Sequence, residues 1–152
     1  MALNDYQDEL TTTAGPPVTS TQSIVGNAAT AINGGKVKDG GAAGDWGAGE
    51  PIKAWMRVTT AAVGATGGVQ FDIVTSAAST LTSPTVLTTK TIATASLTIN
   101  SLHYIGTLKP GTRLRYLGAQ ITPLATATTA GSVILFLTKG ADSTPQDRVN
   151  SI

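Results

Sequence analysis

Residues 51–60, P-I-K-A-W-M-R-V-T-T, decide the fold of this chain. Every second position is apolar, namely Ile52, Ala54, Met56 and Val58. Successive side chains of a β-strand point to opposite faces of the sheet, so this alternation predicts a strand with one face in a core. The opposite face then carries Lys53, Trp55 and Arg57.

Residues 69–75, V-Q-F-D-I-V-T, repeat the alternation, with Val69, Phe71 and Ile73 inward and Asp72 outward. Further strands are predicted at 85–92, at 97–99 continuing or restarting at 102–108, at 113–121 and at 132–138. Proline and glycine separate them, and no helical run lies between them. About eight strands at this spacing predict an all-β fold, an antiparallel two-sheet jelly-roll sandwich.

The chain divides into an N-terminal arm (residues 1–20), a jelly-roll domain (21–139) and a polar C-terminal tail (140–152). The arm is expected to be extended because Gly-Pro-Pro at 15–17 breaks regular structure. The acidic start of the chain differs from an export signal, and no stretch has about 18 continuous apolar residues. We therefore expect synthesis in the cytoplasm and no membrane partner.

The composition argues against catalysis. Charged residues make up 12% of the chain and aromatic residues 5%, with one histidine and no cysteine. We expect no enzyme activity, no cofactor and no metal site of the usual zinc type. His103 alternates with Leu102 and Tyr104, and we place it on the surface. Asp39, Asp45 and Glu50 share a glycine-rich region, where they either form a weak cation site or solvate the loop.

The charges are unevenly distributed. Residues 1–50 carry six acidic residues and two lysines, a net −4, whereas residues 51–139 carry seven basic residues and Asp72, a net +6. This asymmetry favours contact of the arm with a neighbouring copy or of the basic body with an acidic partner. The alternative is contact of the arm with its own body. Lys109, Arg113 and Arg115 form the one basic cluster, which is too small to favour nucleic acid.

Several side chains are candidates for a partner interface. Trp46 lies among glycines in D-W-G-A-G-E-P (45–51), either as an anchor for a partner or as a lid on its own core. Trp55 shares its strand face with Lys53 and Arg57, which indicates a covered interface or an exposed face where Arg57 pairs with Asp72.

The strand V-I-L-F-L (133–137) is apolar on both faces, so Ile134 and Phe136 or their alternates need cover from outside the sandwich. Either the arm or another subunit could provide it. The full set of interface candidates is Tyr6, Leu10, Trp46, Glu50, Lys53, Trp55, Arg57, Arg113, Arg115 and Phe136.

Five segments, in this order, resemble one known family. They are D-W-G-A-G-E-P-I (45–52), G-x-V-Q-F-D-I-V-T-S (67–76), S-P-T-V-L (83–87), K-P-G-T-R-L-R-Y-L-G (109–118) and A-G-S-V-I-L-F-L (130–137). They are similar to the capsid cement, or decoration, proteins of Bordetella-type tailed bacteriophages. The chain departs from that pattern in a longer loop at 34–44 and in its polar tail.

The resemblance implies a jelly roll on the outer surface of the virion that clamps the major capsid protein of an HK97-like capsid and stabilises the DNA-filled head. It also implies a homo-oligomer, with a dimer favoured over a trimer. The alternative function is a carbohydrate-binding jelly-roll module, with Trp46 and Trp55 as stacking platforms for sugars.

Overall fold

The computed structural model describes residues 22–35, 37–45, 51–108 and 112–139. These residues form eleven strands and a 3-10 helix at Thr94–Ser96. The long strands are β5 (Ile52–Gly64), β6 (Val69–Ser76), β7 (Thr85–Ile92), β8 (Leu102–Leu108), β10 (Tyr116–Pro123) and β11 (Thr128–Lys139). The two-residue strands are β1 (Gln22–Ser23), β2 (Ile32–Asn33), β3 (Lys38–Asp39), β4 (Gly44–Asp45) and β9 (Thr112–Arg113).

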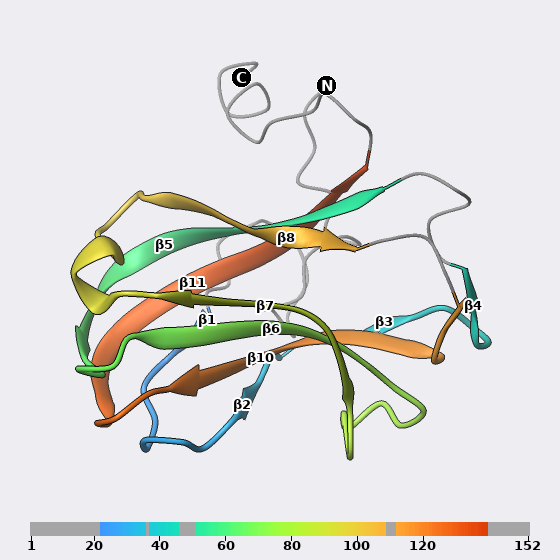
Figure 1. Cartoon of the computed structure of the whole chain (residues 1–152), viewed down its shortest axis with the longest axis horizontal. Helices are drawn as coiled ribbons and strands as arrows, with labels where there is room; N and C mark the ends of the chain where they lie inside the picture. The colour runs from blue at the N-terminus through green and yellow to red at the C-terminus, as the bar shows by residue number, and fades with distance from the viewer. Residues whose placement is uncertain (1–21, 36, 46–50, 109–111, 140–152) are drawn as a thin grey trace.

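The long strands form two antiparallel sheets packed face to face (Figure 1). Sheet A has the order β1-β11-β5-β8, and sheet B has the order β2-β10-β6-β7, with β3 also pairing with β10. Strands β1 and β2 pair with β11 and β10, while β5 and β6 pair with β8 and β7. The chain thus crosses between the sheets at β1–β2, β5–β6, β7–β8 and β10–β11, while β6 and β7 are neighbours in sheet B, which is jelly-roll connectivity. The all-β two-sheet prediction is confirmed.

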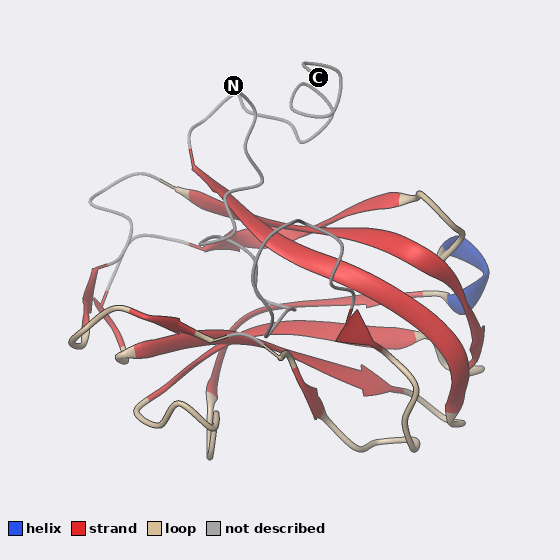
Figure 2. Ribbon diagram, turned by 180° about the vertical axis from the view of Figure 1, so that it is seen from behind, coloured by secondary structure: helices blue, strands red, loops and turns tan. Residues whose placement is uncertain are grey.

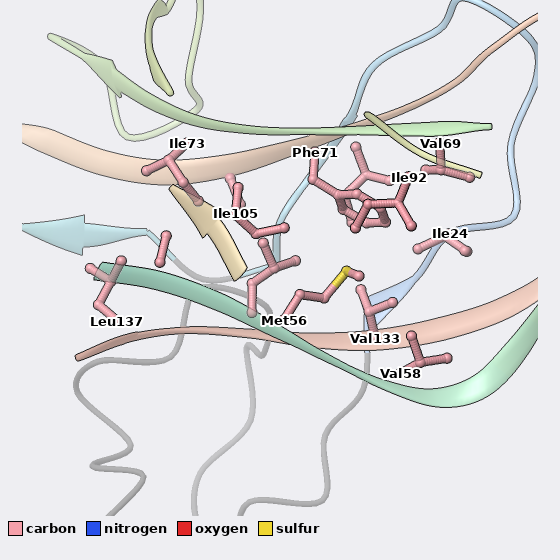
Figure 3. Packing of buried hydrophobic residues seen from close by; sticks show 14 of the residues in the cluster. Ile24, Met56, Val58, Val69, Phe71, Ile73, Ile92, Ile105, Val133 and Leu137 are labelled. Carbon is pink, nitrogen blue, oxygen red and sulfur yellow. The ribbon is translucent and has the colours of Figure 1, made fainter. Parts of the chain in front are cut away.

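The core lies between the two sheets, as Figure 3 shows. The inward positions predicted on β5 and β6 are confirmed, because their side chains are at most 3% exposed. Phe71 of β6 and Met56 of β5 are fully buried, and they face each other across the core from opposite sheets. At Gly106 of β8 the sheets come so close that a Cβ atom would collide with Thr88 of β7.

The loop between β6 and β7 covers part of the outer face of sheet B. Leu81 from this loop is 2% exposed and occupies the space that a side chain at Gly118 of β10 would fill. Ser76 Oγ donates a hydrogen bond to the carbonyl of Thr82 at 3.0 Å and helps to hold the loop. Val74, which is outside the main core cluster, is fully buried as well.

Three local predictions are wrong. Residues 97–99 form no strand; they follow the 3-10 helix, and Leu97 is buried there. Arg57 and Asp72 do not pair, because β5 and β6 lie in different sheets. Arg57 donates instead to Asn100 Oδ1 at 3.0 Å, and Asp72 accepts from Gln70 Nε2 at 2.8 Å.

The third error concerns the faces of β8. A register shift between Ala54 and Trp55 in the β5–β8 pairing places Tyr104 opposite Trp55 and His103 opposite Met56. Tyr104 therefore points outward and is 42% exposed, whereas His103 is half-buried on the Met56 side. Simple alternation failed here because a β-bulge changes which residues share a face.

All described residues lie between positions 22 and 139, inside the predicted domain of residues 21–139. The predicted arm and tail lie outside the described residues. No helix in the described part of the chain is long and apolar enough to cross a membrane.

Candidate interaction surface

An aromatic row crosses three strands on the outer face of sheet A. In the strand register, Trp55 of β5 lies opposite Phe136 of β11 on one side and Tyr104 of β8 on the other. The rings of Trp55 and Tyr104 have centroids 5.1 Å apart and planes inclined by 58°. Figure 2 shows sheet A from behind, with β11 running beside β5. We call Phe136, Trp55 and Tyr104 the aromatic row.

Exposure rises along the aromatic row from β11 to β8. Phe136 is 5% exposed, Trp55 is half-buried and Tyr104 is 42% exposed. The outward neighbours of Phe136 on β11 are also covered, since Ile134 is 5% exposed and Thr138 is 1% exposed. The outer face thus has a covered half on β11 and an open half toward β8. Ile134 and Phe136, for which the sequence predicted cover from outside the sandwich, are both buried on this face.

Two buried polar atoms on this face have no hydrogen-bond partner among the described residues: Trp55 Nε1 and Thr138 Oγ1. A buried donor without a partner costs about 1–3 kcal/mol, so native proteins usually satisfy such groups. These atoms mark the outer face as a surface where further contacts would be favourable.

The charge on this face is positive. Lys53 and Arg57 flank Trp55 on β5, and the sequences of the strands of sheet A contain no aspartate or glutamate. Arg57 is exposed, and its guanidinium is oriented by the hydrogen bond to Asn100. The face therefore combines aromatic residues with an arginine, and both are enriched in protein interfaces.

Asp39 and Arg115 form a second charged site, on β3 and next to β10. Arg115 Nε and Nη2 each donate to a carboxylate oxygen of Asp39 at 2.8 Å, and Gly41 N–H donates to the same carboxylate at 2.8 Å. The hydrogen bond from Arg115 is the main cause that lowers the pKa of Asp39 from 3.8 to about 2. Arg115 also lies over the Tyr116 ring, at 5.0 Å from its centroid.

The carboxylate of Asp39 thus binds the guanidinium of Arg115, whereas the sequence had offered it as a ligand of a weak cation site. Its postulated companions, the side chain of Asp45 and the whole of Glu50, lie outside the described part of the chain. Within the described residues, no group of three or more histidine, aspartate or glutamate side chains is placed to hold a metal ion.

The predicted basic cluster is not a continuous surface patch. Arg113 is only 4% exposed, and it lines a cavity of about 280 Å³ with Leu87, Thr107 and Leu108. Arg115 is exposed but paired, and Lys109 lies outside the described residues. Arg113 is therefore buried beside a cavity, whereas Arg115 lies on the surface in an ion pair.

Residues 18–137 match the Bbp16 family, and this span contains every described strand from β1 to β10 and β11 as far as Leu137. The chain belongs to the Bbp16 family. The family name indicates a protein of a Bordetella phage. A comparison with curated proteins gave no match.

In this Bbp16-family chain, His103 does not form a nucleophile–base pair with its neighbouring serine. His103 Nε2 lies 3.1 Å from the carbonyl oxygen of Ser96 and 2.9 Å from Ser101 Oγ. A carbonyl only accepts, so its hydrogen bond with Nε2 requires the proton on that nitrogen. Nε2 then cannot take a proton from Ser101, whose hydroxyl in turn donates to the carbonyl of Thr98 at 2.7 Å.

The structure brings four of the ten interface candidates together on the outer face of sheet A: Lys53, Trp55, Arg57 and Phe136. Arg113 and Arg115 lie elsewhere, near β9 and β10. Tyr6, Leu10, Trp46 and Glu50 lie outside the described residues.

Sequence reasoning missed Tyr104 and Asn100, which complete the open half of the face in this member of the Bbp16 family. The available signal was the aromatic residue in L-H-Y-I (102–105), which the alternation assigned to the wrong side. No pattern near Asn100 pointed to Arg57, because the two residues are 43 positions apart.

Proposed function

We propose that this protein is a capsid cement protein, which binds the outer surface of an HK97-like bacteriophage capsid and clamps neighbouring major capsid protein subunits. The observation that carries the proposal is the match of the sandwich to a Bordetella phage family. The resemblance of five ordered segments to cement proteins of such phages supports the same function. The protein would act through binding and would not be an enzyme.

The open half of the outer face of sheet A is the surface best suited to the capsid. Tyr104 and Arg57 are exposed there, Trp55 lies between them, and Asn100 orients the guanidinium. Tryptophan, tyrosine and arginine are the residues that most often dominate binding energy at protein interfaces. The positive charge of this face favours an acidic area on the major capsid protein.

A cement protein needs modest contacts repeated by the symmetry of the shell rather than one tight contact. We propose that the protein acts as a homo-oligomer, with a dimer favoured over a trimer, and that each assembly binds two or more capsid subunits. Linked sites gain avidity because the second contact forms at a high effective concentration. Such bridging would oppose the separation of capsomers that internal DNA pressure promotes, and we propose that it takes place on the outer surface of the virion.

The test is co-sedimentation of the purified protein with phage capsids that lack it. The double variant Arg57→Ala/Tyr104→Ser should bind the capsid much more weakly while keeping the circular dichroism spectrum of the parent. Lys90→Ala, which removes an exposed charge from β7 on the other sheet, is the matched control and should bind normally. Equal binding by the double variant and the control would exclude this surface, and absence of binding by the parent protein would exclude the cement function.

The second candidate is a carbohydrate-binding module, which the contact of half-buried Trp55 with exposed Tyr104 favours because sugars stack on aromatic faces. Binding of the isolated protein to a glycan array, with loss of that binding in Trp55→Ala, would support this function. Binding to capsids without any glycan signal would favour cement.

A further inference from the structure

We propose that the covered half of the outer face of sheet A is the docking surface for the N-terminal arm (residues 1–20) of the same chain. In this arrangement Tyr6 and Leu10 contact Phe136 and the adjoining side of Trp55, and the acidic residues of the arm lie near Lys53. The proposal concerns the isolated protein, so it does not depend on the capsid role.

The first argument is the burial of side chains that point away from the core. Ile134, Phe136 and Thr138 alternate with the inward residues of β11, yet they are at most 5% exposed within a single chain. Strand β5 supplies their register partners on one side. On the other side β1 pairs with β11 only at Val133 and Ser132, so its described residues stop short of Ile134. The described part of β1 therefore does not extend over these three side chains, and this edge of the face is open to another part of the same chain.

The second argument is the direction in which the chain enters the sheet. Strand β1 runs antiparallel to β11, with Gln22 opposite Val133 and Ser23 opposite Ser132. The residues before Gln22 therefore arrive from the side on which β11 continues toward Phe136 and Thr138. At about 3.3 Å per extended residue the arm can span about 65 Å, whereas four strands about 4.8 Å apart are about 15 Å wide. The arm starts beside the covered half and is long enough to cross it.

The third argument is chemical complementarity. The arm contains Asp5, Asp8 and Glu9 and no lysine or arginine, while the strands of sheet A contain no acidic residue. Tyr6 and Leu10 are spaced among these acids and supply apolar contacts. Backbone carbonyls of an extended arm also provide the acceptors that the described residues do not offer to Trp55 Nε1 and Thr138 Oγ1.

The C-terminal tail is the competing occupant, because it follows Lys139 at the end of β11. Its large apolar residues are Val149 and Ile152, at its far end, and its side chains carry a net charge of −1 from two aspartates and one arginine. The arm carries a net −3 and has more apolar residues. The positive, apolar face therefore fits the arm better than the tail.

The test uses Trp55 as a reporter in a Trp46→Phe background, where it is the remaining tryptophan. Deletion of residues 2–17 should shift the fluorescence emission maximum of Trp55 to longer wavelength and raise its quenching constant with acrylamide. Deletion of residues 141–152 is the matched control and should change neither. If the tail deletion causes the shift and the arm deletion does not, the tail is the occupant and the proposal is wrong.

A full-length Tyr6→Ser/Leu10→Ser variant provides a readout even if the arm deletion does not fold. It should show the same red shift with an unchanged far-ultraviolet circular dichroism spectrum, and an unshifted spectrum would overturn the proposal. The shift should be independent of protein concentration, because dependence on concentration would assign the arm to a second copy. Adding a synthetic peptide of residues 1–17 to the arm-deleted chain should reverse the shift, whereas a peptide with serine in place of Tyr6 and Leu10 should not.

Discussion

The contact between Trp55 and Tyr104 lends itself to a quantitative prediction. The ring centroids lie 5.1 Å apart and the planes are tilted by 58°, which is within the range of favourable aromatic pairs. Such a pair contributes about 0.5–1.5 kcal/mol beyond the area that it buries. Because Tyr104 is 42% exposed, we place the coupling energy near the middle of this range, at about 1 kcal/mol.

The assay is a double-mutant cycle in which the parent, Trp55→Ala, Tyr104→Ala and the double variant are unfolded in urea and followed by circular dichroism. The double variant should lose about 1 kcal/mol less than the sum of the single variants. In a domain of this size, that coupling corresponds to about 2–4 °C in melting temperature. Independent sites add to within about 0.3–0.5 kcal/mol, so a smaller coupling would show that the two rings do not act as a pair.

Three further predictions concern the scaffold. Gly106→Val should destabilise the fold by about 1–3 kcal/mol because the two sheets are in close contact there, whereas Gly44→Val, with open space around it, should change the urea midpoint little. Phe71→Ala should cost about 3–5 kcal/mol in urea unfolding, because its ring is fully buried. The pKa of Asp39, followed by NMR, should be about 2 and should rise toward 3.8 in Arg115→Gln; an unchanged value in that variant would contradict the ion pair. Since folding lowers this pKa, the contribution of Asp39 to stability should be complete above pH 3.8 and be lost as the pH falls through about 2.

Much of the fold could be predicted from local sequence because period-two alternation reports directly which face of a strand is buried. Residues 52–58 are an example, since all four of their inward positions are in the core. The pairing of β5 with β11 was not predictable in the same way. Their partners, such as Trp55 and Phe136, are far apart in sequence, and no local pattern specifies which strands become neighbours.

The candidate surface was predictable in part. The outward positions of Trp55 and Arg57 followed from alternation, and the two-sided apolar pattern of β11 indicated a covered outer face at Phe136. Tyr104 was missed because one bulge reverses the faces of β8. Arg113 was taken for a surface residue because its burial depends on the packing of β9 near β7 and β8, which the local sequence does not encode.

The order of strands in the jelly roll has a consequence for synthesis on the ribosome. Strand β10 lies between β2 and β6 in sheet B, and β11 lies between β1 and β5 in sheet A. The first strands to emerge therefore have no neighbour until the last two have left the exit tunnel. Among the described pairings within sheets A and B, β5–β8 and β6–β7 alone can form earlier, so neither sheet can be completed before nearly the whole chain has been translated. During that interval the inward faces of β5 and β6 are exposed, and a nascent chain of this kind depends on rapid completion or on chaperones to avoid aggregation.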